Sequence, residues 1–297
     1  MNFKDLLKFS KGKKILHTTH TFSDCDGIAS VFWGLKVFGG DYYIPALELR
    51  SAYGLVKKLN LTPEKKLNYK EYDLFFIYDT EKQENVDFLP LEKNKYVIFD
   101  HHHGRDSAFL KNAMYVYSQP SSANVVNLYE LSIVNEIELS EDILLAFAVG
   151  LYTDTAALRT ARSNEFYYMS KFLLEKRLED ILDIIYLEPI DKDNFLKLLE
   201  NIKFFYIKTL SIAVSKFNNQ NEYFGFIDGL FNILNLDILI GILPEGIKIH
   251  MKKKHIQKVY HRLLIPLQKE LRINRDHGIW YNFYDYKSIL KTLENYQ

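Results

Sequence analysis

Apolar positions in the N-terminal half of the chain alternate between short continuous runs and helical spacing. The runs "KKILHT", "YYIPAL", "YDLFFIYD" and "KYVIFD" are typical of strands buried on both faces. Between the first two, "GIASVFWGLKVF" has the i, i+3, i+4 spacing of a helix packed on a sheet. A short N-terminal helix and a polar helix over residues 52–60 extend this alternation. The pattern predicts an α/β fold, with a mostly parallel sheet flanked by helices.

The middle of the chain is predicted to be helical. The segments "SSANVVNLYELSIV" and "SEDILLAFAVGLYTD" predict two helices with serines as N-caps, the second with Asp142 in its first turn. A third helix is expected over residues 164–185. Pro189 and the charged residues after it predict a boundary near residues 187–194. We therefore expect a first domain at 1–187, a linker region at 188–200 and a second domain at 201–297.

The second domain carries its own pattern of strands and helices. The runs "LSIAVSKF", "DILIGILP" and "GIKIHMKKK" predict strands, and residues 255–269 and 285–293 predict helices. This segment is therefore expected to form a smaller α/β or α+β domain.

Composition narrows the class of protein. The chain has 297 residues, 47% of them hydrophobic, which is enough for one large or two medium domains. Lysine plus arginine and aspartate plus glutamate number 38 each, so the chain lacks the basic excess of a typical duplex-DNA-binding protein. The single Cys25 excludes an intramolecular disulfide, and neither a signal core nor an apolar run of about 20 residues is present. A soluble cytoplasmic protein without a membrane association is expected.

Acidic and imidazole side chains gather after the predicted strands. Ligands bind outside the carboxyl ends of parallel strands, where loops from several strands converge. Four separate segments deliver such residues to that edge: His20, Asp24 and Asp26; Asp79; Asp100 with His101, His102 and His103; and Asp154.

Simpler explanations exist for each segment alone. An aspartate at a strand end is often a helix cap or turn residue. The start "DCDG" fits a calcium loop poorly, because Leu35 stands where a glutamate ligand is required. It also fits a haloacid dehalogenase-like phosphatase poorly, because residues 17–23 separate "KKIL" from the first aspartate. The histidines alone could be a solvated loop. However, a buried "YVIF" would bring Asp100 and His101 to the sheet edge, and a metal ion would offset the cost of burying them.

Taken together, the segments resemble one family. "HTFSDCDG", "FIYDT", "FDHH" and "GLYTDTAALRT" follow the order and character of the four motifs of the DHH phosphoesterase family, over roughly residues 13–165. The chain is similar to the nanoRNase/pAp phosphatase-like and RecJ-like members, with a divergent DHHA1-like second domain.

The resemblance implies a site for two divalent ions, usually Mn²⁺. His20 and Asp24 would hold one ion, Asp26, His101 and Asp154 the other, and Asp79 would bridge them. Two ions about 3.5 to 4 Å apart can acidify a water molecule and neutralise phosphate oxygens. Mixed imidazole and carboxylate ligands suit Mn²⁺ better than Mg²⁺. Co²⁺, Mg²⁺, Fe²⁺ and Zn²⁺ are the alternatives.

Other motif residues receive roles near the substrate from the same resemblance. His102 would face the phosphoryl group, Asp100 would orient an imidazole, and Arg159 would support either the substrate or the local loop. His103 is interpreted as a solvated or hydrogen-bonded histidine. Ala156 and Leu158 replace a glycine and a phenylalanine of the family's fourth motif.

Features that would identify the substrate are weaker. The glycine-rich "GGGH" segment usual in DHHA1 domains is missing from the sequence. Its nearest counterpart is "INRDHGIW", where Arg275, His277 and Gly278 would contact substrate, although a surface turn is the favoured explanation. The basic run at residues 248–258 could follow a nucleic-acid backbone or be a solvated strand end.

The predicted function is therefore a manganese-dependent phosphoesterase acting on nucleotides or short single-stranded oligonucleotides. An inorganic pyrophosphatase and a non-catalytic nucleotide or nucleic-acid-binding protein are the alternatives. The sequence does not determine the oligomeric state, a homodimer being one option.

Overall fold

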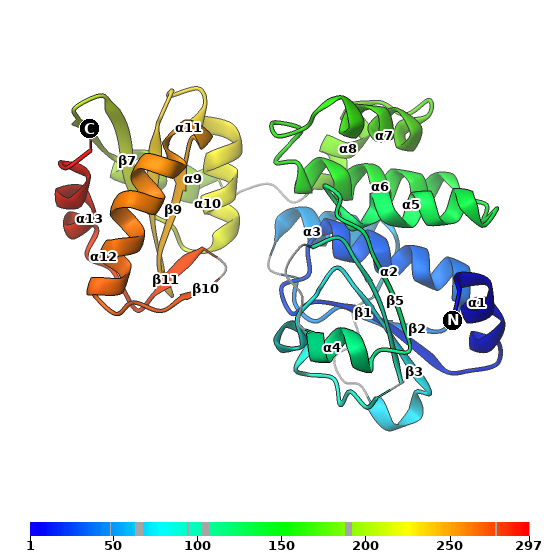
Figure 1. Cartoon of the computed structure of the whole chain (residues 1–297). Helices are drawn as coiled ribbons and strands as arrows, with labels where there is room; N and C mark the ends of the chain where they lie inside the picture. Colours follow the sequence, from blue (N-terminus) through cyan, green and yellow to red (C-terminus); the bar gives the residue numbers. More distant parts are fainter. Residues whose placement is uncertain are drawn as a thin grey trace. The chain divides into compact units, whose positions relative to one another are not determined.

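The computed structural model describes residues 1–47, 49–62, 68–93, 95–102, 107–187, 192–276 and 278–296. The chain divides into two compact units, Met1–Glu188 and Pro189–Gln297, which we call unit 1 and unit 2. Figure 1 shows the course of the chain through both. The predicted α/β class is confirmed in each.

Unit 1 is built around a parallel sheet in the order β2-β1-β3-β4-β5. Its strands are β1 Ile15–Thr19, β2 Asp41–Tyr43, β3 Leu74–Tyr78, β4 Tyr96–Asp100 and β5 Tyr115–Ser118. The helices of this unit are α1 Phe3–Ser10, α2 Cys25–Phe38, α3 Arg50–Lys58, α4 Ser107–Asn112, α5 Asn124–Val134, α6 Glu141–Asp154, α7 Ser163–Leu173 and α8 Leu178–Ile185, with 3₁₀ turns η1 Tyr69–Glu71 and η2 Gln83–Val86.

The central strands are buried on both faces, as their continuous apolar runs predicted. Alternate residues point to opposite sides of the sheet. Phe76 and Phe99 belong to a core cluster shared with α1, α2, α5 and α6, whereas Ile77 and Ile98 pack on the other side with Phe109 of α4. Helices therefore cover both faces of the sheet (Figure 1).

Unit 2 contains a mixed sheet in the order β10-β11-β9-β8-β7-β6, in which only the β7–β8 pair is parallel among the described strands. Its strands are β6 Lys203–Ile207, β7 Leu210–Lys216, β8 Ile238–Leu243, β9 Gly246–Met251, β10 Arg275–Asp276 and β11 Ile279–Tyr281. The helical segments are α9 Lys192–Asn201, α10 Gln220–Phe226, η3 Ile227–Phe231, α11 Lys253–His255, η4 Ile256–Leu264, α12 Ile265–Glu270 and α13 Tyr286–Leu293.

Several predicted boundaries were wrong. The helix expected over 164–185 is two helices, α7 and α8, because the chain turns at Leu174 with a φ of 50°. The run "YYIPAL" gives only the three-residue strand β2. Strands β5, β6, β10 and β11 and helices α4, α9 and α10 were not predicted. Helix α9 occupies most of the stretch expected to be a linker.

The helix predicted over 255–269 exists, but its first half, η4, is wound as a π-helix. None of the described helices is both long enough and apolar enough to cross a lipid bilayer.

Candidate metal centre

The carboxyl ends of β1, β3 and β4 lie next to one another. Thr19 pairs with Tyr78, and Tyr78 pairs with Phe99, so the residues that follow these strands leave the sheet side by side. Asp79 is held at this edge by a hydrogen bond from its backbone N–H to the carbonyl of Phe99 (2.8 Å). Its φ of 60° turns the chain sharply and directs its side chain into the unit.

One group of candidate ligands consists of His20, Asp24 and Asp79, whose ligand atoms all lie within 4.8 Å of one another. The His20 Nε2 atom is 3.7 Å from Asp24 Oδ2 and 3.5 Å from Asp79 Oδ2. Asp24 is also the N-cap of α2, where its Oδ1 accepts a hydrogen bond from the backbone N–H of Gly27 (2.9 Å). The cap uses one carboxylate oxygen and leaves the other facing His20.

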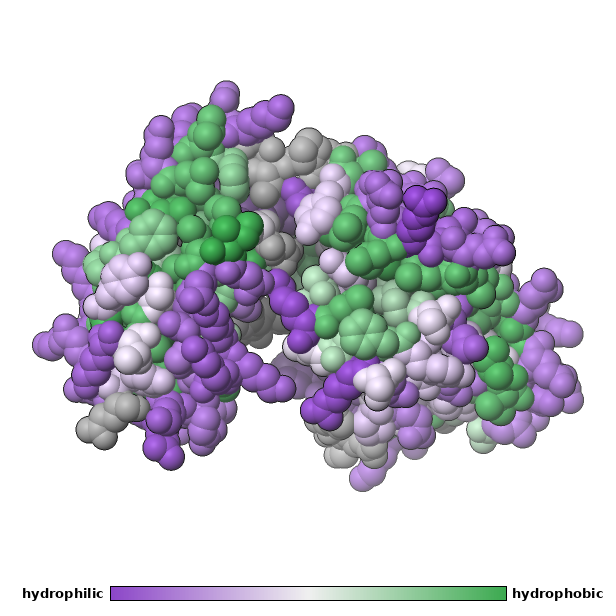
Figure 2. All heavy atoms as spheres, turned by 90° about the horizontal axis from the view of Figure 1, so that it is seen from above, coloured by the Kyte–Doolittle hydropathy of each residue, from purple (hydrophilic) through white to green (hydrophobic). Residues whose placement is uncertain are grey.

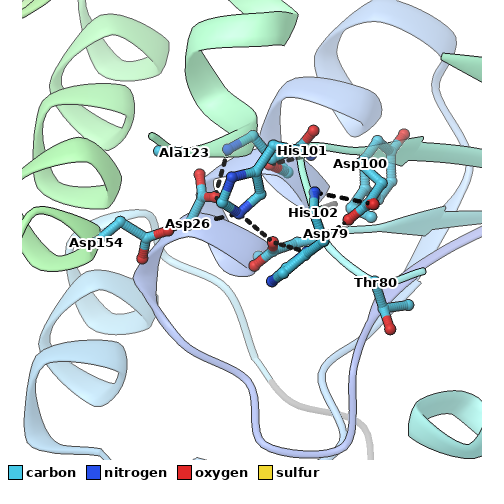
Figure 3. A network of polar contacts seen from close by, with 12 residues as sticks. Asp26, Asp79, Thr80, Asp100, His101, His102, Ala123 and Asp154 are labelled. Carbon is cyan, nitrogen blue, oxygen red and sulfur yellow. Dashed lines mark hydrogen bonds and ion pairs between the residues drawn. The ribbon is translucent and has the colours of Figure 1, made fainter. Parts of the chain in front are cut away.

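A second group consists of Asp26, His101 and Asp154, again within 4.8 Å. The His101 Nε2 atom is 3.7 Å from both Asp26 Oδ2 and Asp154 Oδ2. In Figure 3 the side chains of this group converge from different segments of the chain. Gly150 allows α6 to approach α2, since a Cβ atom there would lie 3.1 Å from the Asp26 Cα.

Asp26 also explains why the predicted serine N-cap of α5 was wrong. The N-cap residue is Ala123, which provides no side-chain hydrogen bond. The fully buried Asp26 carboxylate takes this role instead, accepting hydrogen bonds from the backbone N–H groups of Asn124 (2.6 Å) and Val125 (2.9 Å). The serine expected at the start of α6 is confirmed, because Ser140 accepts from the N–H of Ile143.

Asp79 connects the two groups. Its Oδ2 faces His20, and its Oδ1 is 3.2 Å from His101 Nε2, the side chain being only 2% exposed. Despite this proximity, Asp79 Oδ1 has no hydrogen bond of acceptable geometry within the described part of the chain. A buried carboxylate oxygen without a donor is costly, so this atom is suited to a cation.

His102 and Asp100 form a separate pair at the rim. The Nδ1–H of His102 donates to Asp100 Oδ1 (2.8 Å), and the backbone N–H of His102 donates to Asp100 Oδ2 (3.1 Å). Asp100 is buried, whereas the His102 side chain is 47% exposed. The pair therefore holds the imidazole in one orientation with Nε2 as its free nitrogen.

Ionisation of the cluster is strongly linked. Burial and the charge of Asp79 raise the pKa of Asp26 to about 8. Burial opposes protonation of His20 and His101, but their carboxylate neighbours outweigh it and raise the pKa of each to about 10. Burial, followed by Asp26 and the other carboxylates, raises the pKa of Asp154. Without a cation, protons bind to the same carboxylates and imidazoles that would otherwise bind metal.

The pKa of Asp79 shifts in the opposite direction. Burial favours its protonated form, but the adjacent imidazoles of His101 and His20 keep the pKa of Asp79 below its usual range. Asp79 is therefore the anion around which both groups are arranged.

The donor set fits divalent metal. It combines imidazole nitrogens and carboxylate oxygens, the ligands that Mn²⁺, Fe²⁺ and Zn²⁺ share in proteins. His101 donates its Nδ1–H to the carbonyl of Ser121 (3.0 Å), which leaves Nε2 available to a cation. All six predicted ligands are brought together: His20, Asp24, Asp26, Asp79, His101 and Asp154.

The remaining predicted residues lie elsewhere or outside the described residues. Arg159 follows α6 after a turn in which Ala156, Ala157 and Leu158 all have positive φ, between 51° and 62°. Arg275 and Gly278 lie in unit 2 at the turn between β10 and β11, where the Arg275 guanidinium stacks on Tyr260 at 4.7 Å. His103 and His277 lie outside the described residues.

Supporting residues at the start of α5 were not found from the sequence. Asn127 Nδ2 donates to the carbonyl of Asp100 (3.0 Å), and Asn124 Nδ2 donates to Ser30 Oγ (3.0 Å). Together with Ser121, these asparagines tie α5 and the loop before it to the segment of His101 and to α2, which carries Asp26. The polar start of "SSANVVN" is the signal in the sequence, and it predicts a helix cap rather than these contacts.

Residues 14–151 match the model of the DHH family, N-terminal domain. Unit 1 carries a DHH family domain. The predicted family is thereby confirmed for residues 14–151, and the cluster lies in this domain, except that Asp154 follows the matched residues by three positions.

The chain also resembles solved structures, among them two with low sequence identity. One, from Methanococcus jannaschii, is described as a "putative family II inorganic pyrophosphatase"; it is 13% identical, covers 94% of this chain and 98% of its own, and has a TM-score of 0.48. The other is CDC45 from Entamoeba histolytica, 11% identical, covering 98% of this chain and 53% of its own, with a TM-score of 0.37. No curated protein sequence matches the chain.

Proposed function

We propose that this protein is a phosphoesterase that depends on two divalent ions, Mn²⁺ being preferred. The observation that carries the proposal is the position of Asp79, between His20 with Asp24 on one side and His101 with its carboxylate partners on the other. Such ions, when bound, acidify a water molecule for attack on phosphorus and neutralise phosphate oxygens.

The ligand roles follow from the two groups. His20 and Asp24 would hold one ion, and Asp26, His101 and Asp154 the other, with one oxygen of Asp79 directed to each. Asp26 is fixed by the N–H groups of α5, and His101 by the carbonyl of Ser121, so these ligands are oriented before an ion arrives.

His102 is the proposed proton donor to the leaving oxygen. Its hydrogen bond with Asp100 is the main cause of a raised His102 pKa, so the imidazole holds its proton further into the neutral range. Because Nδ1 is engaged by Asp100, Nε2 is the atom that would meet substrate. Arg159 is proposed to support the substrate or the loop behind Asp154.

The proposed substrates are nucleotides or short single-stranded oligonucleotides. Supporting this choice are the resemblance to nucleotide-hydrolysing DHH proteins and the balanced net charge, which suits a short anionic ligand better than a long duplex. The experiment is a panel of dinucleotides, 3',5'-bisphosphates, cyclic dinucleotides and pyrophosphate, incubated with Mn²⁺ and analysed for mononucleotide and phosphate.

The matched variants for that panel are Asp79→Ala and Asp87→Ala. Asp87 is exposed and follows η2 in the same loop region, so it controls for loss of a carboxylate. We expect the first variant to lose roughly a thousandfold in rate and the second to keep it. Equal turnover by both variants would refute the proposal. If the wild type released phosphate from pyrophosphate and hydrolysed no other compound of the panel, pyrophosphate would replace nucleotides as the proposed substrate.

A further inference from the structure

Strand β6 forms one edge of the unit 2 sheet, and its outer side has no partner among the strands that the structure describes. A two-residue turn leads to β7 and ends in the pair of Ile207 with Leu210. Ser211, the next residue of β7, directs both of its backbone groups away from β6. Its N–H donates to Asp237 Oδ2 (3.1 Å), and its C=O accepts from the N–H of Asp237 (2.7 Å).

The backbone groups of Tyr206 and Phe204 therefore lie on the free edge of β6. Tyr206 is the residue opposite Ser211, which offers it no hydrogen bond. In an antiparallel pair, residues that exchange hydrogen bonds alternate with residues that do not. Phe204, two positions earlier, consequently has the same orientation as Tyr206. The free edge presents the N–H and C=O groups of both residues.

The same two residues expose large rings. Phe204 is 51% exposed and Tyr206 is 81% exposed, and the alternation of side chains places both on one face of the strand. Phe205 points to the other face, where its ring lies 6.5 Å from that of Tyr286. Figure 2 shows that hydrophobic patches interrupt the hydrophilic surface at several places, so an exposed ring alone does not identify an interface. In β6, exposed rings coincide with backbone groups on a free edge.

The other edge strands that the structure describes are shorter or better protected. Strand β10 consists of two charged residues, and β2 has three residues, beginning with Asp41. Strand β5 has four residues, all of them half-buried. Strand β6 has five residues, and its stretch from Phe204 to Ile207 contains neither a charge nor a proline. Charges and prolines are the usual protection of an edge against pairing, so β6 is suited to pair.

We propose that β6 pairs in antiparallel fashion with β6 of a second copy of the chain, about a two-fold axis at Phe205. In this register Phe204 lies opposite the partner's Tyr206, and the two residues exchange their backbone hydrogen bonds. The same pair occurs on the other side of the axis, so the free N–H and C=O groups of both strands are satisfied. The unit 2 sheets of the two copies become one continuous sheet.

The charges that flank β6 are compatible with this register. Lys203 lies opposite the partner's Ile207, and Lys208 lies opposite the partner's Ile202, so neither lysine meets another lysine. Like charges directly opposite each other destabilise a strand pair, whereas aromatic pairs stabilise it. The sequence of β6 is therefore complementary to a second copy of itself.

The contact is small. A standard interface buries about 800 Å² per partner, more than one edge strand of this length supplies. The dimer should therefore dissociate on dilution. This inference is independent of the proposed function, because no residue of the metal centre takes part in the contact.

The first test is sedimentation of the full chain between about 1 and about 300 µM, where a small interface associates. We expect a concentration-dependent dimer for the wild type. Phe204→Lys with Tyr206→Lys places like charges opposite each other in both pairs and should weaken dimerisation at least roughly tenfold. The matched variant, Phe204→Glu with Tyr206→Lys, loses the same rings but places opposite charges together. It should dimerise more tightly than the double-lysine variant.

A second control adds charge elsewhere. Phe166→Lys with Tyr167→Lys introduces the same charges on α7, at two residues that are each 53% exposed. This variant should dimerise as the wild type does.

The position of the axis is tested by a disulfide. Phe205 faces its own copy in a pair without hydrogen bonds, where the Cα atoms lie about 4.5 Å apart, within the range of a disulfide. Phe205→Cys should therefore form a covalent dimer under mild oxidation. Ile207→Cys, on the same face but opposite the partner's Lys203, should not. The native Cys25 is buried and does not compete.

A wild type that stays monomeric over the whole concentration range would overturn this inference. So would equal dimerisation by the double-lysine and the glutamate–lysine variants, since the contact would then lie elsewhere on the chain. A monomeric wild type whose Phe204 and Tyr206 amides become protected from hydrogen exchange only when an oligonucleotide is added would assign the edge to that ligand instead.

Discussion

Both units place a buried aspartate beside histidine, but the two clusters are completed differently. In unit 2, Asp237 is 7% exposed, and its Oδ1 accepts a hydrogen bond from His255 Nε2 (2.9 Å). The ammonium groups of Lys254 and Lys252 lie 3.2 and 3.5 Å from the same oxygen, and the N–H of Ser211 donates to Oδ2. Every acceptor of this carboxylate has a donor from the chain itself.

In unit 1, several carboxylates share the imidazoles, and one Asp79 oxygen is left without a good donor. The same residue types therefore give two outcomes. Asp237 is neutralised by fixed cations and stabilises its own unit. In the DHH domain cluster, burial together with the charge of Asp79 raises the pKa of Asp26 to about 8. Satisfied hydrogen bonds distinguish a structural ion cluster from a candidate metal centre, even where both contain Asp and His.

The largest expected effect is on turnover. Asp79→Asn preserves the size of the side chain but removes the charge shared by both ligand groups, so the rate should fall roughly a thousandfold. Without metal at pH 7, the same variant should melt lower than the wild type, because protonated His20 and His101 lose the carboxylate that they share. Asp237→Asn should retain the metal affinity of the wild type. Rates are measured with the best substrate of the panel. Comparable rates for wild type and Asp79→Asn would show that the unit 1 cluster is no more catalytic than the structural ion cluster of unit 2.

Metal stabilisation should depend strongly on pH. Asp26 has a raised pKa in the folded state, so its contribution to metal-free stability is lost as pH rises from about 4 to about 8. The contributions of His20 and His101 are complete below about 6.5 and disappear as pH rises through about 10. Mn²⁺ replaces these protons.

We therefore expect excess Mn²⁺ to raise the melting temperature by about 5 °C more at pH 8.5 than at pH 6. Differential scanning calorimetry at both pH values checks this, with Mg²⁺ as the second ion. A larger Mn²⁺ effect at pH 6 would contradict the pKa shifts on which the expectation is based.

Unit 2 should respond to pH in the opposite direction. Burial opposes ionisation of Asp237, but the N–H of Ser211 and the side chains of His255 and Lys254 keep its pKa below the usual range. Its contribution is present above about pH 4 and is lost as pH falls below that. Asp237→Ala should reduce the free energy of unfolding by about 2 kcal/mol at pH 7, because it leaves His255 Nε2 without its carboxylate partner.

Urea unfolding followed by tryptophan fluorescence measures this, since the buried Trp280 is in unit 2 and Trp33 in unit 1. Asp193→Ala, at an exposed position of α9, is the control. Equal loss of stability at pH 3 and pH 7 would show that the charge of Asp237 is not the cause.

The smallest expected effect concerns the backbone behind Asp154. Ala156, Ala157 and Leu158 occupy the left-handed region, which costs a non-glycine residue about 1 kcal/mol. Neither Asp237 nor His255 has such a conformation. Ala156→Gly should raise the free energy of unfolding by about 0.5 to 1 kcal/mol, and Ala161→Gly, outside the positive-φ residues, should not. Chemical denaturation checks both, and a loss of stability in Ala156→Gly would argue against strain at this turn.

Much of the fold could be predicted where one local signal dominated. The parallel core of unit 1 was predicted from the continuous apolar runs of β1, β3 and β4 and the helical spacing of α2. A strand that is buried on both faces needs apolar residues at every position, so its sequence is such a run. The edge strands β5 and β6 were missed, since their apolar runs, "YVY" and "FFYI", are too short to distinguish a partly exposed strand from a helical turn. The break between α7 and α8 was missed because the turn residue, Leu174, is neither glycine nor proline, the residues that usually mark a turn in a sequence.

The six candidate ligands were predicted because their motifs lie at strand and helix ends in a fixed order. The sequence by itself determined this chemistry, namely which residue types stand at the carboxyl ends of strands, since strand ends are a local property of hydrophobic pattern. Only the tertiary structure decided which oxygen of Asp79 lacks a donor and that Asp26 caps α5 across a long sequence separation. Such contacts depend on how α2, α5 and α6 pack, and packing joins residues that no local pattern connects.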